Sequence, residues 1–199
     1  MKKIIGLIPT RLNSSRLPNK ALLELNNIPL VIHTYKRAKL SKKLDDVIIC
    51  CDDRKILNVA KKFKAKAILT SKHHVNGTER IAEAFKKVNK KYDLVVDIQG
   101  DEPLISPFHI DKVIDEHIKN FSKADIILPT LLTSKKNNTN LVKVVCDKNN
   151  YVLYLSRANI PFEFKTNTKN VKKHLSIISF KPKSLESFAK SKKTTLEAI

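Results

Sequence analysis

Short apolar runs alternate with longer stretches of helical periodicity through most of the chain, and this alternation limits the possible folds more than any other feature. The runs have the length of strands and are bounded by turn residues, at 3–8, 47–51, 67–69, 94–98 and 126–129. Strands that alternate with helices build a mainly parallel sheet covered by helices. The sequence therefore predicts an α/β fold.

Start signals place the expected helices between these strands. Pro29 stands where a first helical turn begins, and apolar side chains follow at helical spacing at Val31, Ile32, Tyr35 and Ala38. A short helix is expected over 54–63. Asn76 has the character of an N-cap, with Glu79 three residues later, for a helix through Val88. Ser106 and Pro107 open the next helix.

The last third of the chain has a different pattern. Strands are expected over 141–146 and 151–155, joined by a hairpin turn at 147–150, and a further strand over 174–180. The stretch 133–140 is polar and is expected to be mobile. Because no linker demands two independent domains, we expect a single domain over 1–199 whose last third forms a β-rich lobe.

Composition excludes some classes of protein and leaves others open. The 199 residues suffice for one core, and no apolar run approaches the roughly 20 residues that cross a bilayer. Pro9 interrupts the apolar run that follows Met1, so we expect a cytoplasmic protein without a signal peptide or membrane contact. The three cysteines are expected to be free thiols. The net charge of +20 suits nucleic acid or small anions, but the lysines are scattered in pairs, so nucleic-acid binding ranks last.

A basic loop follows the first expected strand, from Thr10 to Lys20. It carries Arg11, Arg16 and Lys20 among hydroxyl and amide side chains. Guanidinium groups form forked bonds with phosphate oxygens, and an ammonium adds a compact charge. The loop lacks the glycines of a P-loop. It predicts triphosphate binding, with an ordinary solvated basic loop as the alternative.

An acidic turn, Gln99 to Pro103, follows the fourth expected strand. Ligands of open α/β sheets bind at the carboxyl ends of the strands, where both loops are expected. Carboxylates opposite a phosphate-binding loop suit Mg²⁺. The alternative is a tight turn in which Gly100 bends the chain and Asp101 caps it. Taken together, the two loops predict a metal-nucleotide site.

Several segments, in the same order along the chain, carry a family resemblance. Residues 11–20 match the signature R-x-x-S-x-R-L-P-x-K, residues 74–80 are similar to H-x-S-G-T-[DE]-R, and residues 96–103 are similar to V-N-x-Q-G-D-E-P. Residues 142–145 and 154–161 continue the match. The sequence thus resembles the sugar-acid cytidylyltransferases, most closely the 3-deoxy-manno-octulosonate (Kdo) cytidylyltransferases.

This resemblance implies a fold and a reaction. The fold is a three-layer, Rossmann-like nucleotidyltransferase fold with a mostly parallel mixed sheet and a small β-rich dimerisation lobe. The reaction uses CTP and Mg²⁺ to transfer CMP to the anomeric hydroxyl of an acidic sugar, with release of pyrophosphate, for lipopolysaccharide or surface-glycan precursors. The family is usually homodimeric.

The resemblance also implies a role for particular residues. Arg11, Ser15, Arg16 and Lys20 would hold the triphosphate, and Asn76, Gly77, Thr78 and Arg80 would help to place the cytidine. Asp101 would bind the metal, and Lys20, Arg16 and Asp101 would act at the reacting phosphate. Gln99, Arg157 and His174 would contact the sugar acid. His74 lies in one of the motifs, whereas the remaining histidines show no ligand-like cluster.

The chain departs from the family pattern at two positions and at its end. Ile178 replaces a tyrosine that gives the sugar pocket a hydroxyl, and Asn76 replaces a serine. Residues 194–199 resemble the start of a later family helix. The family continues through a strand and a V-D-T-x-x-D segment, whose first aspartate is a second metal ligand. We therefore expect a chain that lacks this C-terminal segment and turns over slowly.

Three other functions stay open at this point. The first is activation of another sugar acid, of amino-Kdo or nonulosonate type, because Ile178 changes the sugar pocket. The second is a non-catalytic CTP-binding remnant. The third is nucleic-acid binding, which rests on the charge alone.

Overall fold

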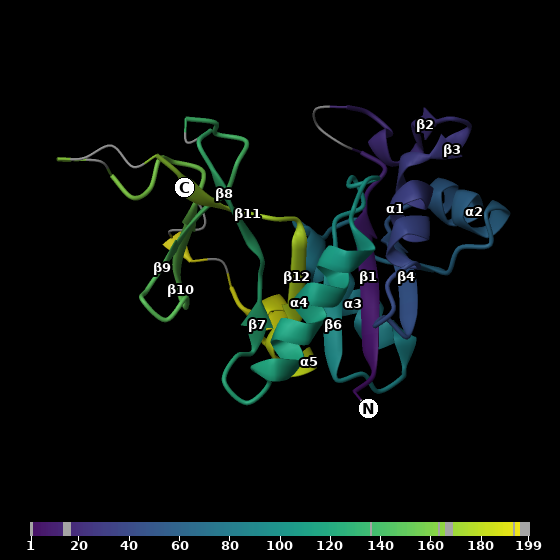
Figure 1. Ribbon diagram of the computed structural model, residues 1–199. Coiled ribbons are helices and arrows are strands. Elements are labelled where there is room, and N and C mark those ends of the chain that lie inside the picture. Colours follow the sequence, from purple (N-terminus) through teal and green to yellow (C-terminus); the bar gives the residue numbers. More distant parts are fainter. Residues whose placement is uncertain are drawn as a thin grey trace. The chain divides into compact units, whose positions relative to one another are not determined.

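The computed structural model describes residues 2–13, 17–135, 137–162, 164–165, 169–192 and 194–195 (Figure 1). The chain divides into two compact units, Met1–Ile127 with Ser176–Ile199, and Leu128–Leu175. The prediction of a single domain over 1–199, without the family's C-terminal segment, stays a prediction. None of the described helices is long and apolar enough to cross a membrane.

The described part of the first unit contains a six-stranded sheet with the order β5-β4-β1-β6-β12-β7. Its strands are β1 (Ile4–Thr10), β4 (Asp46–Cys51), β5 (Ala67–Leu69), β6 (Leu94–Ile98), β7 (Ile126–Ile127) and β12 (Ile177–Phe180). Strands β5, β4, β1 and β6 run parallel, whereas β12 pairs antiparallel with both β6 and β7. The predicted mostly parallel mixed sheet is confirmed.

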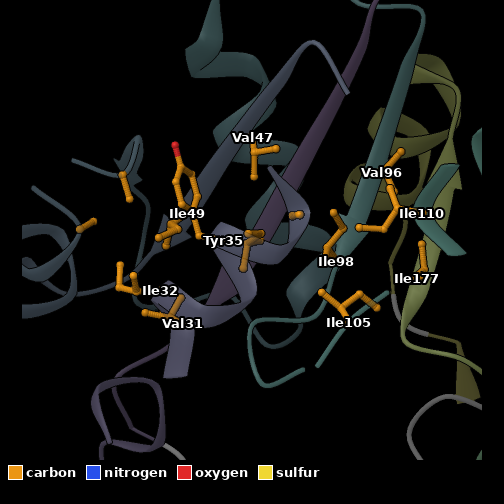
Figure 2. Packing of buried hydrophobic residues seen from close by; sticks show 14 of the residues in the cluster. Val31, Ile32, Tyr35, Val47, Ile49, Val96, Ile98, Ile105, Ile110 and Ile177 are labelled. Atoms are coloured by element: carbon orange, nitrogen blue, oxygen red, sulfur yellow. The ribbon is translucent and has the colours of Figure 1, made fainter. Parts of the chain in front are cut away.

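Helices cover both faces of this sheet and complete the three predicted layers (Figure 1). One apolar cluster joins the sheet to α1 (Leu30–Ala38), α2 (Arg54–Lys62) and α4 (Pro107–Lys119), and the other joins it to α3 (Gly77–Val88) and α5 (Pro182–Lys190). Side chains of β1 alternate between the clusters, with Ile4 and Ile8 in the first and Ile5 and Leu7 in the second. Figure 2 shows part of the first cluster, around Tyr35.

The predicted start signals are confirmed where the structure has caps. The Asn76 side chain accepts a hydrogen bond of 2.8 Å from the Glu79 N–H, so α3 begins at Gly77. Pro29 is the N-cap of α1, and Pro107 is the first residue of α4. The buried residues of α1 include all four that the helical spacing predicts, Val31, Ile32, Tyr35 and Ala38.

Several elements of the first unit differ from the sequence prediction. Strand β1 runs through Pro9 to Thr10, because β4 still pairs with both residues in the parallel register. The segment after the basic loop contains a 3₁₀ turn η1 (Lys20–Leu22) and a hairpin of β2 (Glu24–Leu25) and β3 (Ile28–Pro29), which no apolar pattern announces. Helix α5 is also absent from the prediction.

The second unit is a four-stranded antiparallel sheet with the order β10-β9-β11-β8 in its described part. Its strands are β8 (Thr130–Thr133), β9 (Lys143–Cys146), β10 (Val152–Ser156) and β11 (Val171–His174). The predicted hairpin is confirmed, since β9 and β10 pair and the Asp147 N–H donates to the Tyr151 carbonyl at 2.9 Å.

The prediction of one strand over 174–180 is wrong. Val171–His174 forms β11 in the small sheet, whereas Ile177–Phe180 forms β12 in the large sheet. Leu175 and Ser176 separate the two strands, and the backbone N–H of Leu175 donates to Pro129 rather than to a neighbour in the large sheet. Apolar content alone could not reveal that the two halves of this run pair with different partners.

Candidate functional site

A cleft of about 560 Å³ opens in the first unit at the carboxyl ends of β1 and β6, the place where the sequence predicts ligand binding. Residues from four segments line it: the end of β1, the basic loop with η1, the start of α3 and the turn after β6. Among these residues are Thr10, Arg11, Lys20, Asn76, Gly77, Arg80, Gln99 and Asp101. The structure therefore brings together most of the predicted nucleotide residues.

The basic loop reaches this cleft through its two ends. Arg11 is exposed at the end of β1, and Lys20 begins η1 after Asn19, whose φ of 55° lies in the left-handed region. Ser15 and Arg16 lie outside the described residues, so their predicted contacts with the triphosphate stay predictions.

Lys20 and Asp101 meet across the cleft in an ion pair. Lys20 Nζ lies 2.6 Å from Asp101 Oδ2, and both side chains are partly exposed. The residue predicted to bind phosphate and the residue predicted to bind the metal are therefore direct neighbours.

Gly100 allows the acidic turn to approach β1 closely. A Cβ at this position would lie 2.8 Å from the Pro9 carbonyl oxygen, a backbone atom. The Gly100 carbonyl in turn accepts a hydrogen bond of 3.2 Å from the buried Thr34 hydroxyl of α1. These contacts fix Asp101 beside the end of β1.

The first turn of α3 forms a wall of the cleft. Asn76 and Gly77 line the cleft, whereas Thr78 is half-buried and is not among the described lining residues. Arg80 also lines the cleft, but the residue is 3% exposed and its guanidinium donates to the Thr70 hydroxyl at 2.7 Å and to the Ser71 carbonyl at 3.0 Å. Arg80 thus holds the segment before α3 in place.

Asp52 links this arrangement to the basic loop, and sequence reasoning missed it. One of its oxygens lies 3.5 Å from Arg80 Nη2, and the other accepts a hydrogen bond of 2.9 Å from the Leu12 N–H. Asp52 could have been predicted from its position. It directly follows the apolar run 47–51, at the same edge of the sheet as the two predicted loops.

His74 also lines the cleft and is held by carboxylates of α3. It is hydrogen-bonded to Glu83, and its Nδ1 lies 3.6 Å from Glu79 Oε2. Burial alone would raise the pKa of Glu83, but hydrogen bonds from Lys87, the Ser71 N–H and His74 outweigh it and lower this pKa to about 2. Glu83 is therefore ionised at neutral pH and anchors the segment before α3.

Gln99 lines the cleft at the end of β6 and is hydrogen-bonded to a buried carboxyl. Its Nε2 lies 3.0 Å from Asp97 Oδ1, and Asp97 is 1% exposed. Burial raises the pKa of Asp97 to about 7. Sequence reasoning treated Asp97 only as part of a matching motif.

Arg157 and His174, predicted to contact the sugar acid, belong to the second unit. Arg157 follows β10 and donates to the carbonyls of Thr139 and Asn140 at 3.2 and 3.1 Å. The buried ammonium of Lys143 donates to the Arg157 carbonyl at 2.7 Å. His174 ends β11 and is half-buried. Their contact with a sugar stays a prediction.

Asp101 has the chemistry that a magnesium ion needs from a protein. Within the described ranges no group of three or more His, Cys, Asp or Glu side chains could hold a metal by itself. Mg²⁺ is commonly held by one or two carboxylates together with substrate phosphates and water. A single carboxylate beside a basic cleft fits that pattern.

Comparison with known proteins shows which family the chain matches. The profile of a family described as Cytidylyltransferase matches residues 5–199. The chain is 40% identical, over 99% of its length and 81% of the relative's, to a 3-deoxy-manno-octulosonate cytidylyltransferase of Chloroherpeton thalassium. It is 38% identical, over 97% of its length and 80% of the relative's, to an 8-amino-3,8-dideoxy-manno-octulosonate cytidylyltransferase of Shewanella pealeana.

A solved structure is similar over the same extent. It is a CMP:2-keto-3-deoxy-manno-octonic acid synthetase complexed with CTP, with a TM-score of 0.91 and 28% identity over 98% of this chain and 81% of that one. The fold, the profile and the identity over nearly the whole chain agree. The chain therefore belongs to the cytidylyltransferase family and is a nucleotidyltransferase similar to the 3-deoxy-manno-octulosonate cytidylyltransferases.

Proposed function

We propose that this chain transfers CMP from CTP to the anomeric hydroxyl of a 3-deoxy sugar acid, either Kdo or its 8-amino derivative. The observation that carries the proposal is the meeting of Lys20 and Asp101, 2.6 Å apart, in one cleft at the strand ends. Relatives named for Kdo and for 8-amino-Kdo are about equally similar to the chain, at 40% and 38% identity.

The reaction is a displacement at the α-phosphorus of CTP. The anomeric oxygen forms a bond to that phosphorus, the bond to the bridging oxygen of the β-phosphate breaks, and pyrophosphate leaves with the bonding electrons. The hydroxyl proton passes to solvent. Such a step depends on positioning and on neutralisation of charge, so it needs no covalent intermediate with the protein.

Each side of the cleft has a task in this proposal. Arg11, Ser15, Arg16 and Lys20 bind the phosphates, and Lys20 and Arg16 stabilise the charge that develops at the reacting phosphate. Asn76, Gly77 and Thr78 place the cytidine at the start of α3, and Arg80 supports that segment. Gln99, Arg157 and His174 contact the sugar acid.

Asp101 would hold Mg²⁺ together with phosphate oxygens of CTP. When bound, the ion would neutralise phosphate charge and favour the in-line geometry. Lys20 must then leave Asp101, and its ammonium becomes available to the triphosphate.

The sugar pocket bears on which acid is used. Ile178 of β12 lies opposite Asp97 of β6 and has no group that can form a hydrogen bond with a hydroxyl. A pocket without that hydroxyl loses one means of selecting a sugar. We therefore propose a Kdo-type acid destined for lipopolysaccharide or another surface glycan, and treat nonulosonates as the alternative.

We further propose a cytoplasmic homodimer. Strand β10 carries large apolar side chains that are exposed on both of its faces, among them Leu153 at 66% and Tyr154 at 53%. An edge strand with such side chains is suited to pairing with a second copy of the chain.

A pyrophosphate-release assay with a panel of substrates tests the function. We expect release that needs CTP, Mg²⁺ and either Kdo or 8-amino-Kdo, with UTP and a nonulosonate much poorer. Tight CTP binding without pyrophosphate release from any acid would instead indicate a non-catalytic remnant. Salt-sensitive binding of DNA or RNA that displaces CTP would indicate a nucleic-acid-binding protein.

A further inference from the structure

Asp97 is a carboxyl group in an apolar layer. It lies in β6, opposite Ile178 of β12 and paired with Leu7 of β1, and it is 1% exposed. Leu7 and Ile178 belong to the apolar cluster beneath α3 and α5. A buried carboxylate among such neighbours is costly, and an apolar residue of similar volume would fill the same space at lower cost. Packing therefore does not account for this residue.

The Asp97 carboxyl accepts a hydrogen bond from the side chain of Gln99. The donor is Gln99 Nε2, at 3.0 Å from Asp97 Oδ1. The Gln99 amide is also close to α3, since a Cβ on Gly77 would lie 3.7 Å from Nε2. The Asp97 carboxyl and the first residue of α3 thus both lie near the Nε2 end of the amide.

This contact determines which end of the amide is available to a ligand. Oδ1 of Asp97 accepts the hydrogen bond, and the NH₂ end of the Gln99 amide donates it. The amide oxygen is bonded to the same carbon on the opposite side and points away from Asp97. Because Gln99 lines the cleft, the oxygen is the atom left for a bound molecule.

We propose that Asp97 is a positioning residue, which holds the Gln99 amide so that its carbonyl oxygen faces the cleft and accepts a hydrogen bond from a hydroxyl or amino group of the sugar acid. The proposal rests on the proposed function, because it assigns Gln99 to the sugar. It makes Gln99 selective for substrates that present a donor at this place. A carboxylate or keto oxygen there would be repelled.

The variant Asp97→Leu distinguishes a role in positioning Gln99 from a role in stabilising the fold. Leucine fits the apolar layer and removes a buried polar group, so we expect thermal stability equal to or above that of the wild type. We also expect the KM for the sugar acid to rise about tenfold, with the KM for CTP within about twofold of the wild type. Asp97→Asn keeps one acceptor and should lose less. Ile5→Val, in the same apolar cluster, should leave both KM values unchanged.

A double-mutant cycle then asks whether Asp97 acts through Gln99. In a Gln99→Leu background, Asp97→Leu should add no further rise in the KM for the sugar acid. An unchanged KM for the sugar in Asp97→Leu, or the same rise in the Gln99→Leu background, would overturn the proposal.

The orientation of the Gln99 amide can also be measured in the absence of catalysis. Such a measurement tests the positioning role of Asp97 separately from the proposed function. In nitrogen-15 NMR spectra, the side-chain NH₂ of Gln99 should be protected from solvent exchange in the wild type and lose that protection in Asp97→Leu. An NH₂ that exchanges freely in the wild type would overturn the positioning role. A wild type that releases no pyrophosphate while its Gln99 NH₂ is protected would overturn only the proposed function.

Discussion

Lys20 Nζ lies 2.6 Å from Asp101 Oδ2, so the predicted phosphate-binding cation and the predicted metal-binding carboxylate neutralise each other when no nucleotide is bound. Both side chains are partly exposed, and ion pairs of this kind add little to stability. The pair instead affects binding, because a metal ion must compete with the Lys20 ammonium for Asp101. A triphosphate relieves the competition by offering Lys20 another anion.

Removal of the Lys20 charge should therefore change metal binding and nucleotide binding in opposite directions. In Lys20→Met, we expect Mn²⁺ alone to bind more tightly, by about fivefold, while CTP affinity and turnover fall by more than about tenfold. Isothermal titration with Mn²⁺, with and without CTP, measures both effects. Lys43→Met, which removes a lysine that pairs with Asp115 elsewhere, is the control. A weaker affinity for Mn²⁺ alone would contradict the competition.

Gly100 and Gly6 offer a matched test of the close approach beside the site. A Cβ on Gly100 would lie 2.8 Å from the Pro9 backbone oxygen, whereas a Cβ on Gly6 would lie 2.9 Å from the end of the flexible Leu44 side chain. Because backbone yields less than a side-chain methyl, Gly100→Ala should lose about 2 kcal/mol of stability and most activity, and Gly6→Ala should lose less. Urea unfolding of the two variants decides. Equal losses would show that the approach of Gly100 to Pro9 is not critical.

Arg80 should contribute to stability through its buried contact with Asp52. The Arg80 side chain is 4% exposed and that of Asp52 is 12% exposed, and Arg80 Nη2 lies 3.5 Å from Asp52 Oδ2. Arg80→Met leaves Asp52 without its cation and should cost about 3 kcal/mol in the free energy of unfolding. The double variant Arg80→Met/Asp52→Asn removes both charges and should recover part of that loss. If the double variant is no more stable than Arg80→Met, the charge of Asp52 is not the cause.

The raised pKa of Asp97 predicts how stability depends on pH. Burial raises it from 3.8 to about 7, so in the interval between these values the folded chain holds a proton that the unfolded chain has released. Stability therefore falls as pH rises through this interval, by about 1.4 kcal/mol per pH unit, and becomes level above it. Asp97→Asn should lack this fall. Urea midpoints of both proteins at several pH values test it, and parallel curves would contradict a buried titrating carboxyl.

The exposed apolar side chains of β10 predict a self-association surface in the second unit. Leu153→Glu should convert a dimer into a monomer, because a charge in an apolar interface must be desolvated. Light scattering after size exclusion gives the mass. Leu104→Glu, at an even more exposed apolar residue of the first unit, is the control. A monomeric wild type, or a dimer that survives Leu153→Glu, would contradict the dimer.

Much of the large sheet could be predicted because its central strands β1, β4 and β6 are mainly apolar runs that are buried on both faces. Ala67–Leu69 and Leu94–Ile98 have the bounds that the sequence predicts. The short elements could not be predicted in the same way. β2 and β3 have two residues each, and the run 174–180 hides a change of sheet at Leu175 that depends on distant partners.

The residues of the candidate site were predictable where a charged side chain directly follows an apolar strand. Lys20 and Asp101 stand out because charges directly after apolar runs suit a ligand site. Asp52 and Asp97 escaped for a physical reason: their roles come from contacts with Arg80 and Gln99, 28 and 2 residues away, whose geometry only the folded chain defines. The burial that makes Arg80 a support for the segment before α3 is likewise a tertiary property.

Transfer of a cytidylyl group from CTP to a sugar acid is tested most directly with CTP that is labelled at the α-phosphate. With Mg²⁺ and Kdo or 8-amino-Kdo, the label should appear in a CMP-sugar, with one pyrophosphate released for each sugar that is modified. Label that stays in CTP with every acid, or that appears only in free CMP, would contradict cytidylyl transfer by this chain.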